Sequence, residues 1–186
     1  TELLNEGTDR EVFSSTGGNF TLAANVEHGY LWDYPAGVAT FTGAGLTGNL
    51  LDNQLYGNQV ANTLDGGAGN DILYGSVSIA GAVSEDSAVD TLKGGAGDDA
   101  YYVFNGDIVT ELAAGGIDIV YLGGNNPSYT LANEVENLTV QNTSVTSVTG
   151  NALANIIDGS GGAAGGITID GLAGNDTLYG TAGADT

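Results

Sequence analysis

Aspartate and asparagine recur at intervals of nine residues in two stretches of the chain, and this spacing indicates where its chemistry lies. From Gly48 the sequence runs in blocks of nine that carry Asn or Asp in the sixth position and most often Leu in the eighth. The sixth-position residues are Asn53, Asn62, Asp71, Asp90 and Asp99 in the first stretch, and Asn155, Asp176 and Asp185 in the second. Blocks that stack in register gather these side chains into rows, and rows of carboxylates attract cations.

Each block predicts a turn followed by a short strand. Two or three glycines within four positions require positive φ or a close approach of the backbone, so the first six residues should form a turn. The last three, such as Ile72, Leu73 and Tyr74, are apolar and too few for a helix, so they favour a strand. Two blocks would close one coil of about 18 residues, and stacked coils would align the eighth-position leucines as a core. We therefore predict an all-β solenoid with two narrow parallel sheets facing each other.

A larger duplication contains these blocks. Residues 1–31 align without gaps on residues 110–140, and residues 63–75 resemble residues 168–180. A single block has no core of its own, so we expect one continuous solenoid over residues 1–186. Within it we expect irregular β segments at 1–45 and 104–147, and nine-residue arrays at 46–103 and 148–186.

The charge of the chain excludes several partners and favours a metal. Of 186 residues, 23 are acidic and two are basic, which gives a formal net charge of −21. Nucleic acids and anionic membranes bind through Lys and Arg, and no apolar run is long enough to span a bilayer, so we expect neither partner. Carboxylates about 4.8 Å apart repel by about 1 kcal/mol per pair in water. With carbonyls freed by glycine they form an oxygen cage that suits Ca²⁺ better than Mg²⁺, so we predict several bound calcium ions.

Three blocks carry a resemblance to a known family. Residues 66–74, GGAGNDILY, match the nine-residue RTX repeat GGxGxDxUx at every specified position. Residues 94–102 match with Tyr101 in the apolar position, and residues 171–179 match except for Leu172. The chain thus resembles the RTX, or hemolysin-type, calcium-binding repeat proteins. This resemblance implies a right-handed parallel β-roll, calcium in the turns and export by type I secretion.

The resemblance also implies ligand sets, because in such rolls an ion lies between one turn and the turn two blocks later. The best-formed site would use Gly67, Gly69 and Asp71 with Glu85, Ser87 and Asp90. A second would use Asn49, Leu51 and Asn53 with Gly66, Ala68 and Asp71, and Gly94, Ala96 and Asp99 would form half of a third. In the second copy Gly171, Ala173 and Asp176 would face Asn151, Leu153 and Asn155, and Gly180, Ala182 and Asp185 would form another half-site. Asparagine at positions 53, 62 and 155 also indicates turns held by side-chain hydrogen bonds.

Other polar and aromatic residues leave alternatives open. Glu2, Asp9, Glu111 and Asp118 recur in both copies. We interpret them as strand-end caps, as peripheral calcium ligands or as a solvated acidic edge. His28 is replaced by Asn137 in the second copy, which argues against a catalytic base. The alternating Tyr30, Trp32 and Tyr34 form either a carbohydrate-stacking face or one side of a strand that covers the core.

These observations favour a noncatalytic role. We expect a calcium-binding structural repeat of a secreted or cell-surface bacterial protein, of the adhesin, S-layer or fibre type. It would fold on extracellular calcium and associate with itself through the open ends of the solenoid. The alternative is a folding and secretion module of a type I-secreted enzyme, such as a protease, a lipase or a polysaccharide-modifying enzyme.

Overall fold

The computed structural model describes residues 7–13, 18–32, 43–76 and 88–186, and in these ranges it contains seventeen β-strands and no helix. The first nine are β1 Arg10–Phe13, β2 Asn19–Thr21, β3 His28–Leu31, β4 Gly45–Thr47, β5 Gln54–Tyr56, β6 Thr63–Ala68, β7 Ile72–Tyr74, β8 Thr91–Ala96 and β9 Ala100–Val103. The others are β10 Ile108–Thr110, β11 Ile119–Leu122, β12 Ser128–Thr130, β13 Asn137–Val140, β14 Ser147–Thr149, β15 Ile156–Asp158, β16 Thr168–Asp170 and β17 Thr177–Tyr179.

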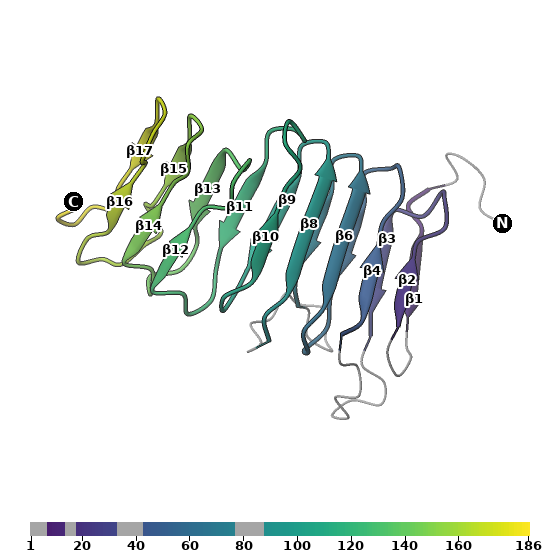
Figure 1. Ribbon diagram of the computed structural model, residues 1–186. Helices are drawn as coiled ribbons and strands as arrows, with labels where there is room; N and C mark the ends of the chain where they lie inside the picture. Colours follow the sequence, from purple (N-terminus) through teal and green to yellow (C-terminus); the bar gives the residue numbers. More distant parts are fainter. Residues whose placement is uncertain (1–6, 14–17, 33–42, 77–87) are drawn as a thin grey trace.

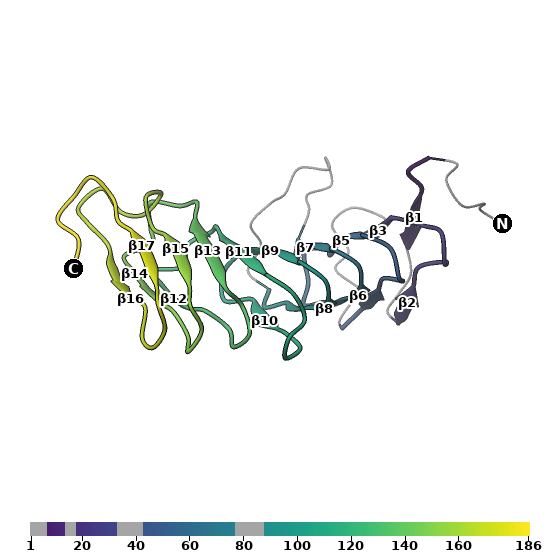
Figure 2. The ribbon, with the colours of Figure 1, turned by 90° about the horizontal axis from the view of Figure 1, so that it is seen from above.

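The strands form two facing layers of parallel sheet (Figure 1). All odd-numbered strands pair in sequence order as one nine-stranded sheet. The even-numbered strands form a five-stranded sheet, β2 to β10, and a three-stranded sheet, β12 to β16. Each odd strand and the even strand after it make one coil, so the chain is a β-solenoid of about eight turns (Figure 2). The predicted all-β solenoid is confirmed, and the second layer is divided between β10 and β12.

The length of each coil follows from the pairing register. Gln54 pairs with Ile72, so this coil consists of two nine-residue blocks, as predicted. The coils that lead from His28 to Gln54 and from Ile72 to Ala100 are longer. They contain residues 33–42 and 77–87, which lie outside the described ranges. The extra residues therefore enter within a coil and leave the stacking of the flanking strands in register.

The duplication is visible in the placement of the strands. In the alignment of residues 1–31 on residues 110–140, Arg10 corresponds to Ile119. These two residues begin β1 and β11, and the first residues of β2 and β3 correspond in the same way to those of β12 and β13. The two copies therefore place equivalent residues at equivalent positions of the coil.

The predicted leucine column is the core. Leu55, Leu64, Leu73, Leu92 and Tyr101 have no exposed surface. Leu55, Leu73 and Tyr101 come from the nine-stranded sheet, and Leu64 and Leu92 face them from the opposite layer. Burial of each such side chain contributes about 1.5–3 kcal/mol. Inward-facing apolar side chains thus fill the space between the two layers, and the turns lie at both edges of the solenoid.

A ladder of stacked tyrosines follows the outer face of the nine-stranded sheet. Tyr30, Tyr56, Tyr74, Tyr102 and Tyr121 lie in register, with ring centroids 4.4–4.9 Å apart. Each contact adds about 0.5–1.5 kcal/mol beyond burial. The ring of Tyr30 has Tyr56 on one face and the Arg10 guanidinium 6.0 Å from its centroid. A sugar stacking on Tyr30 would have to displace one of these neighbours. Tyr34, part of the predicted stacking face, lies outside the described residues.

Candidate metal sites

A residue with an oxygen-bearing side chain directly precedes every strand of the nine-stranded sheet. Because these strands are parallel and in register, the nine residues form one row along an edge of the solenoid, here called the polar row. Its members are Asp9, Glu27, Asn53, Asp71, Asp99, Asp118, Glu136, Asn155 and Asp176. The predicted row of sixth-position side chains is confirmed, and it extends beyond the nine-residue pattern at both ends of the first array.

A ladder of hydrogen bonds joins the polar row from coil to coil. The backbone N–H of Asn53 donates to Asp71 Oδ1 at 2.7 Å, and the N–H of Asp71 donates to Asp99 Oδ1 at 2.7 Å. The N–H of Asp99 donates to Asp118 Oδ1 at 2.8 Å in the same way. Each of these carboxylates therefore uses one oxygen to hold the preceding coil, and its second oxygen is available for another ligand.

The opposite edge of the solenoid carries a shorter row. Asn62, Asp90 and Asp107 directly precede β6, β8 and β10. The N–H of Asn62 donates to Asp90 Oδ1 at 2.7 Å, and the N–H of Asp90 donates to Asp107 Oδ1 at 2.9 Å. Asp107 Oδ2 accepts the N–H of Phe104 at 2.9 Å, so both of its oxygens serve the backbone.

The site that was predicted to be the best formed pairs the wrong turns. Gly67 pairs with Gly95, and Ala68 pairs with Ala96, so the turn that ends at Asp71 stacks on the turn that ends at Asp99. Asp90 lies on the other edge, in the row of Asn62. The reason is that residues 75–93 form one block enlarged by an insertion, whereas counting in nines divides them into two. Glu85 and Ser87, the other predicted partners of Gly67 and Gly69, lie outside the described residues.

The glycine that opens a block makes room for the carboxylate that closes its turn. A Cβ on Gly66 would collide with Asp71 Oδ2 and would lie 2.7 Å from the Gly94 carbonyl oxygen. A Cβ on Gly94 would likewise collide with Asp99 Oδ2. The second and fourth positions have positive φ, 101° at Gly67 and 110° at Gly69, which glycine adopts without strain. The GGxGxD pattern thus folds a carboxylate back over its own turn, beside the carbonyl of the next coil.

Four carboxylate oxygens of this edge are buried and have no hydrogen-bond partner in the described structure. They are Asp71 Oδ2, Asp99 Oδ2, Asp118 Oδ2 and Glu111 Oε1. Burial raises the pKa of Asp71 to about 7, and the charge of Asp99 adds to this rise, while the hydrogen bond from Asn53 opposes it. Burial also raises the pKa of Asp99 and of Asp118 to about 6, and that of Glu111 to about 8. Unpaired carboxylate oxygens beside glycine carbonyls fit a hard divalent cation, which would stabilise their ionised forms.

Turns with asparagine in the sixth position close without a charge. In the block that begins at Gly48, Asn49 N–H donates to Asn53 Oδ1 at 2.7 Å, and Leu51 N–H donates to Asn49 Oδ1 at 2.8 Å. Asn53 Nδ2 donates to the Val26 carbonyl of the previous coil at 3.0 Å. The block at Gly150 repeats these contacts through Asn151, Leu153, Asn155 and Val135, and in the block at Gly57 Asn58 N–H likewise donates to Asn62 Oδ1. The predicted turns held by side-chain hydrogen bonds are confirmed, and their amide groups donate to carbonyls of the preceding turn.

The other predicted partners lie as follows. The turn of Asn49, Leu51 and Asn53 stacks on that of Gly66, Ala68 and Asp71, although Asn49 O already accepts Ala68 N–H at 3.2 Å. The turn of Asn151, Leu153 and Asn155 faces that of Gly171, Ala173 and Asp176, as predicted. The turn of Gly180, Ala182 and Asp185 lies on the other edge, where Asp185 Oδ1 accepts Ile167 N–H at 2.9 Å and the pKa of Asp185 is lowered. Gly94, Ala96 and Asp99 stack on Gly67, Gly69 and Asp71, which would supply the other half of the predicted site.

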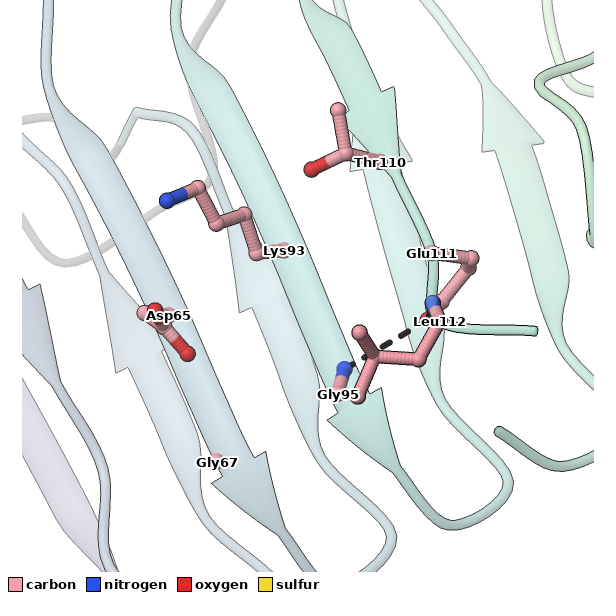
Figure 3. A pocket seen from close by; sticks show the side chains of 7 residues that line it. All are labelled: Asp65, Gly67, Lys93, Gly95, Thr110, Glu111 and Leu112. Carbon is pink, nitrogen blue, oxygen red and sulfur yellow. Dashed lines mark hydrogen bonds between the residues drawn. The ribbon is translucent and has the colours of Figure 1, made fainter. Parts of the chain in front are cut away.

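Sequence reasoning left the role of Glu111 undecided and did not place Glu27 or Glu136 in the polar row. The signal for all three was present, because Thr-Glu-Leu and Val-Glu recur in both copies. A shallow hollow of about 380 Å³ lies over β6, β8 and the segment that contains Glu111 (Figure 3). In Figure 3 the Lys93 amine points away from Glu111, so this lysine does not neutralise it.

Comparison with known proteins agrees with this geometry. A family model, the RTX calcium-binding nonapeptide repeat, matches in four copies at residues 47–77, 86–103 and 168–186. A search of curated proteins and a search of solved structures each gave no match. Among the described residues no helix is long and apolar enough to cross a membrane. The chain therefore carries RTX repeats, which bind several calcium ions and stack here into a parallel β-solenoid.

Proposed function

We propose that the chain is a noncatalytic structural repeat of a secreted or cell-surface bacterial protein, of the adhesin, S-layer or fibre type, that folds on extracellular calcium. The observation that carries this proposal is the polar row, in which Asp71, Asp99 and Asp118 each have a buried, unpaired oxygen. RTX repeats are typical of secreted bacterial proteins. Extracellular calcium modules bind with dissociation constants of about 10⁻⁴–10⁻³ M, which suits millimolar calcium outside the cell and keeps the sites empty in the cytosol.

The mechanism is the coupling of ion binding to coil stacking. Asp71 and Asp99 are contributed by turns that are distant in the chain and touch only when the coils are stacked. Ionised and without a counterion, these carboxylates repel and oppose that stacking. The carboxylates of Asp71 and Asp99 and the glycine carbonyls of both turns would hold a calcium ion, whose positive charge would offset this repulsion. The folded solenoid is then favoured by mass action.

Self-association through stacked coils is part of this proposal, and β17 shows what a further coil would cover. Leu178 follows Ile157 in the core column, yet it is 44% exposed, whereas Ile157 is fully buried. Leu178 lines an open hollow of about 250 Å³ together with Ile169, Gly180, Asp185 and Thr186. A further coil stacked on β17, from a continuation of the same protein or from a second copy, would bury this side chain and pair the strand edge. We expect sedimentation velocity to show concentration-dependent association in calcium, and a strictly monomeric species at high calcium would contradict the stacking.

The second candidate function is a folding and secretion module of an exported enzyme. The same calcium-coupled folding serves it equally well, so the two functions share the mechanism above. A catalytic domain in the reading frame around these 186 residues would decide for the enzyme module. His28 lies in register between Arg10 and Gln54 on the outer face of the nine-stranded sheet, which supports a noncatalytic role for this segment.

Circular dichroism with and without calcium tests the proposed folding mechanism. In EGTA near pH 8 we expect most of the β-sheet signal to be lost, and we expect it to return when calcium is added in excess. Magnesium at the same concentration should restore little of the signal, because it prefers stricter octahedral geometry and retains its waters. A full β-sheet signal in EGTA would show that apolar burial alone holds the solenoid.

A further inference from the structure

A three-carboxylate cluster lies where the first nonapeptide array ends. One carboxylate oxygen from each of Asp99, Glu111 and Asp118 lies within 4.8 Å of the other two. Asp99 closes the last nonapeptide turn of the array, Glu111 follows β10, and Asp118 precedes β11. Asp99 is 1% exposed and Asp118 is fully buried, so the cluster lies between coils and not in open solvent.

Each carboxylate of the cluster has one oxygen engaged by the backbone and one left over. Asp99 Oδ1 accepts Asp71 N–H at 2.7 Å, and Asp118 Oδ1 accepts Asp99 N–H at 2.8 Å. Glu111 Oε2 accepts Leu112 N–H at 3.1 Å, and a longer bond from Gly95 N–H at 3.4 Å (Figure 3). Asp99 Oδ2, Asp118 Oδ2 and Glu111 Oε1 are buried without a hydrogen-bond partner. The backbone thus orients all three groups and leaves three oxygens for a ligand.

The hydroxyl oxygen of Tyr101 and the absence of a Cβ at Gly94 define the same space. A Cβ on Gly94 would collide with Asp99 Oδ2 and Tyr101 Oη and would lie 2.6 Å from Glu111 Oε1. Tyr101 Oη is itself buried and has no hydrogen-bond partner. Gly94 therefore leaves a space on which oxygens of Asp99 and Tyr101, at the start of β9, and of Glu111, after β10, converge.

The chemistry of this space favours a cation. Three ionised carboxylates so close together are mutually repulsive, and burial strengthens the repulsion. Of the two basic residues in the chain, Arg10 lies over Tyr30, and Lys93 points away from Glu111. All the converging atoms are oxygens, which favours a hard ion of the calcium type over zinc or copper.

We propose that Asp99, Glu111 and Asp118 bind one divalent cation of the calcium type, at a site distinct from those between two nonapeptide turns. Glu111 and Asp118 belong to residues 104–167, which the RTX family model does not match. The site deepens the proposed function, because it carries the ion-bridged part of the polar row one coil beyond the array. It rests on calcium binding by this chain and on no property of the parent protein.

Calcium titration calorimetry on the full chain tests the site with Glu111→Gln. The substitution keeps the shape of the side chain and an acceptor for Leu112 N–H, and it removes one charge. Glu134→Gln is the matched control, because Glu134 lies in the next turn of the same edge, outside the cluster. We expect the Glu111→Gln variant to bind one ion fewer than the Glu134→Gln control, or to bind one ion with an affinity lower by about tenfold or more.

Asp118→Asn provides a second variant, because it keeps an acceptor for Asp99 N–H and should lose the same ion. Circular dichroism in saturating calcium checks that every variant folds, and a variant that does not fold is replaced by the other in the titration. If both variants keep the stoichiometry and affinities of the Glu134→Gln control, the site is refuted. If the unaltered chain itself binds no calcium, the proposed function fails as well, so the two failures are distinguishable.

Discussion

Replacing Asp71 by asparagine isolates the contribution of one bound ion to stability. Asp71 is 1% exposed and has an unpaired Oδ2, while its Oδ1 accepts Asn53 N–H. Asp52→Asn is the control, because Asp52 is exposed and its Oδ1 accepts Asn70 N–H at 2.7 Å. Both substitutions remove one negative charge and keep a side-chain oxygen as acceptor. Only Asp71→Asn removes a buried carboxylate oxygen that has no hydrogen-bond partner.

The expected loss follows from ion linkage. A site with a dissociation constant of about 10⁻⁴–10⁻³ M stabilises the fold by about 1.4–2.7 kcal/mol at about 10 mM free calcium. Asp71→Asn should therefore lower the free energy of unfolding by about that amount in calcium, or the melting temperature by about 3–10 °C. Asp52→Asn should change either quantity by at most about 0.5 kcal/mol. Thermal melts followed by circular dichroism at fixed free calcium measure both.

The sign of the Asp71→Asn effect should change when calcium is removed. In EGTA at pH 8, with sucrose added to maintain folding, the wild-type chain holds a carboxylate whose pKa burial has raised to about 7. The asparagine variant holds a neutral amide at this position, so no charge is buried there. Asp71→Asn should then be at least as stable as the wild type. Equal losses with and without calcium, or equal losses in the Asp71 and Asp52 variants, would refute the assignment of an ion to this turn.

Three further predictions concern the calcium-free chain and the turns. In EGTA the β-sheet signal should be largest below about pH 4 and should fall as the pH rises from about 4 to about 8, because the raised pKa values of Asp71 and Glu111 mean that the folded state binds more protons than the unfolded state in this range. A pH titration of ellipticity checks this, and saturating calcium should abolish the fall. Leu172→Gly should raise stability by about 1 kcal/mol in thermal melts, because exposed Leu172 has a φ of 64°. Asn53→Ala should cost about 1–3 kcal/mol in denaturant titrations, equally in calcium and in EGTA with sucrose added to maintain folding, since its turn is closed by amide hydrogen bonds.

The period of nine was sufficient to predict the solenoid. Glycine in the first turn positions, a polar sixth residue and an apolar eighth leave few ways to arrange the chain, and the predicted core residues Leu55, Leu73 and Leu92 are fully buried. The predicted coil of two blocks is also present where no insertion occurs. These features depend on local geometry that repeats, so each block adds the same information.

Counting residues in nines could not predict which turns pair across an insertion. Residues 75–93 contain Gly75, Asp90 and Leu92 at positions that satisfy either one long block or two short ones. Only the stacking of Leu92 on Leu64, and of Gly95 on Gly67, decides between them. Glu111 presents the same difficulty, since it reaches the row from the end of β10, and its partner Asp99 lies before β9, two strands earlier in the chain.

The turns along the edge of the polar row are closed in two chemically different ways. The order of these two kinds of turn along the chain explains how a few ions can stabilise the whole solenoid. Where the second residue is Asn, as at Asn49 and Asn151, amide groups supply the donors that the carbonyls need. Where it is glycine, as at Gly67 and Gly95, a carboxylate with an unpaired oxygen takes that place. The carboxylate turns of Gly67 and Gly95 lie in coils between the amide-closed turns of Asn49 and Asn151, and each coil is stabilised only by its neighbours. Removing calcium therefore destabilises the interfaces on which the amide-closed coils on either side are stacked, although the amide-closed turns need no ion themselves.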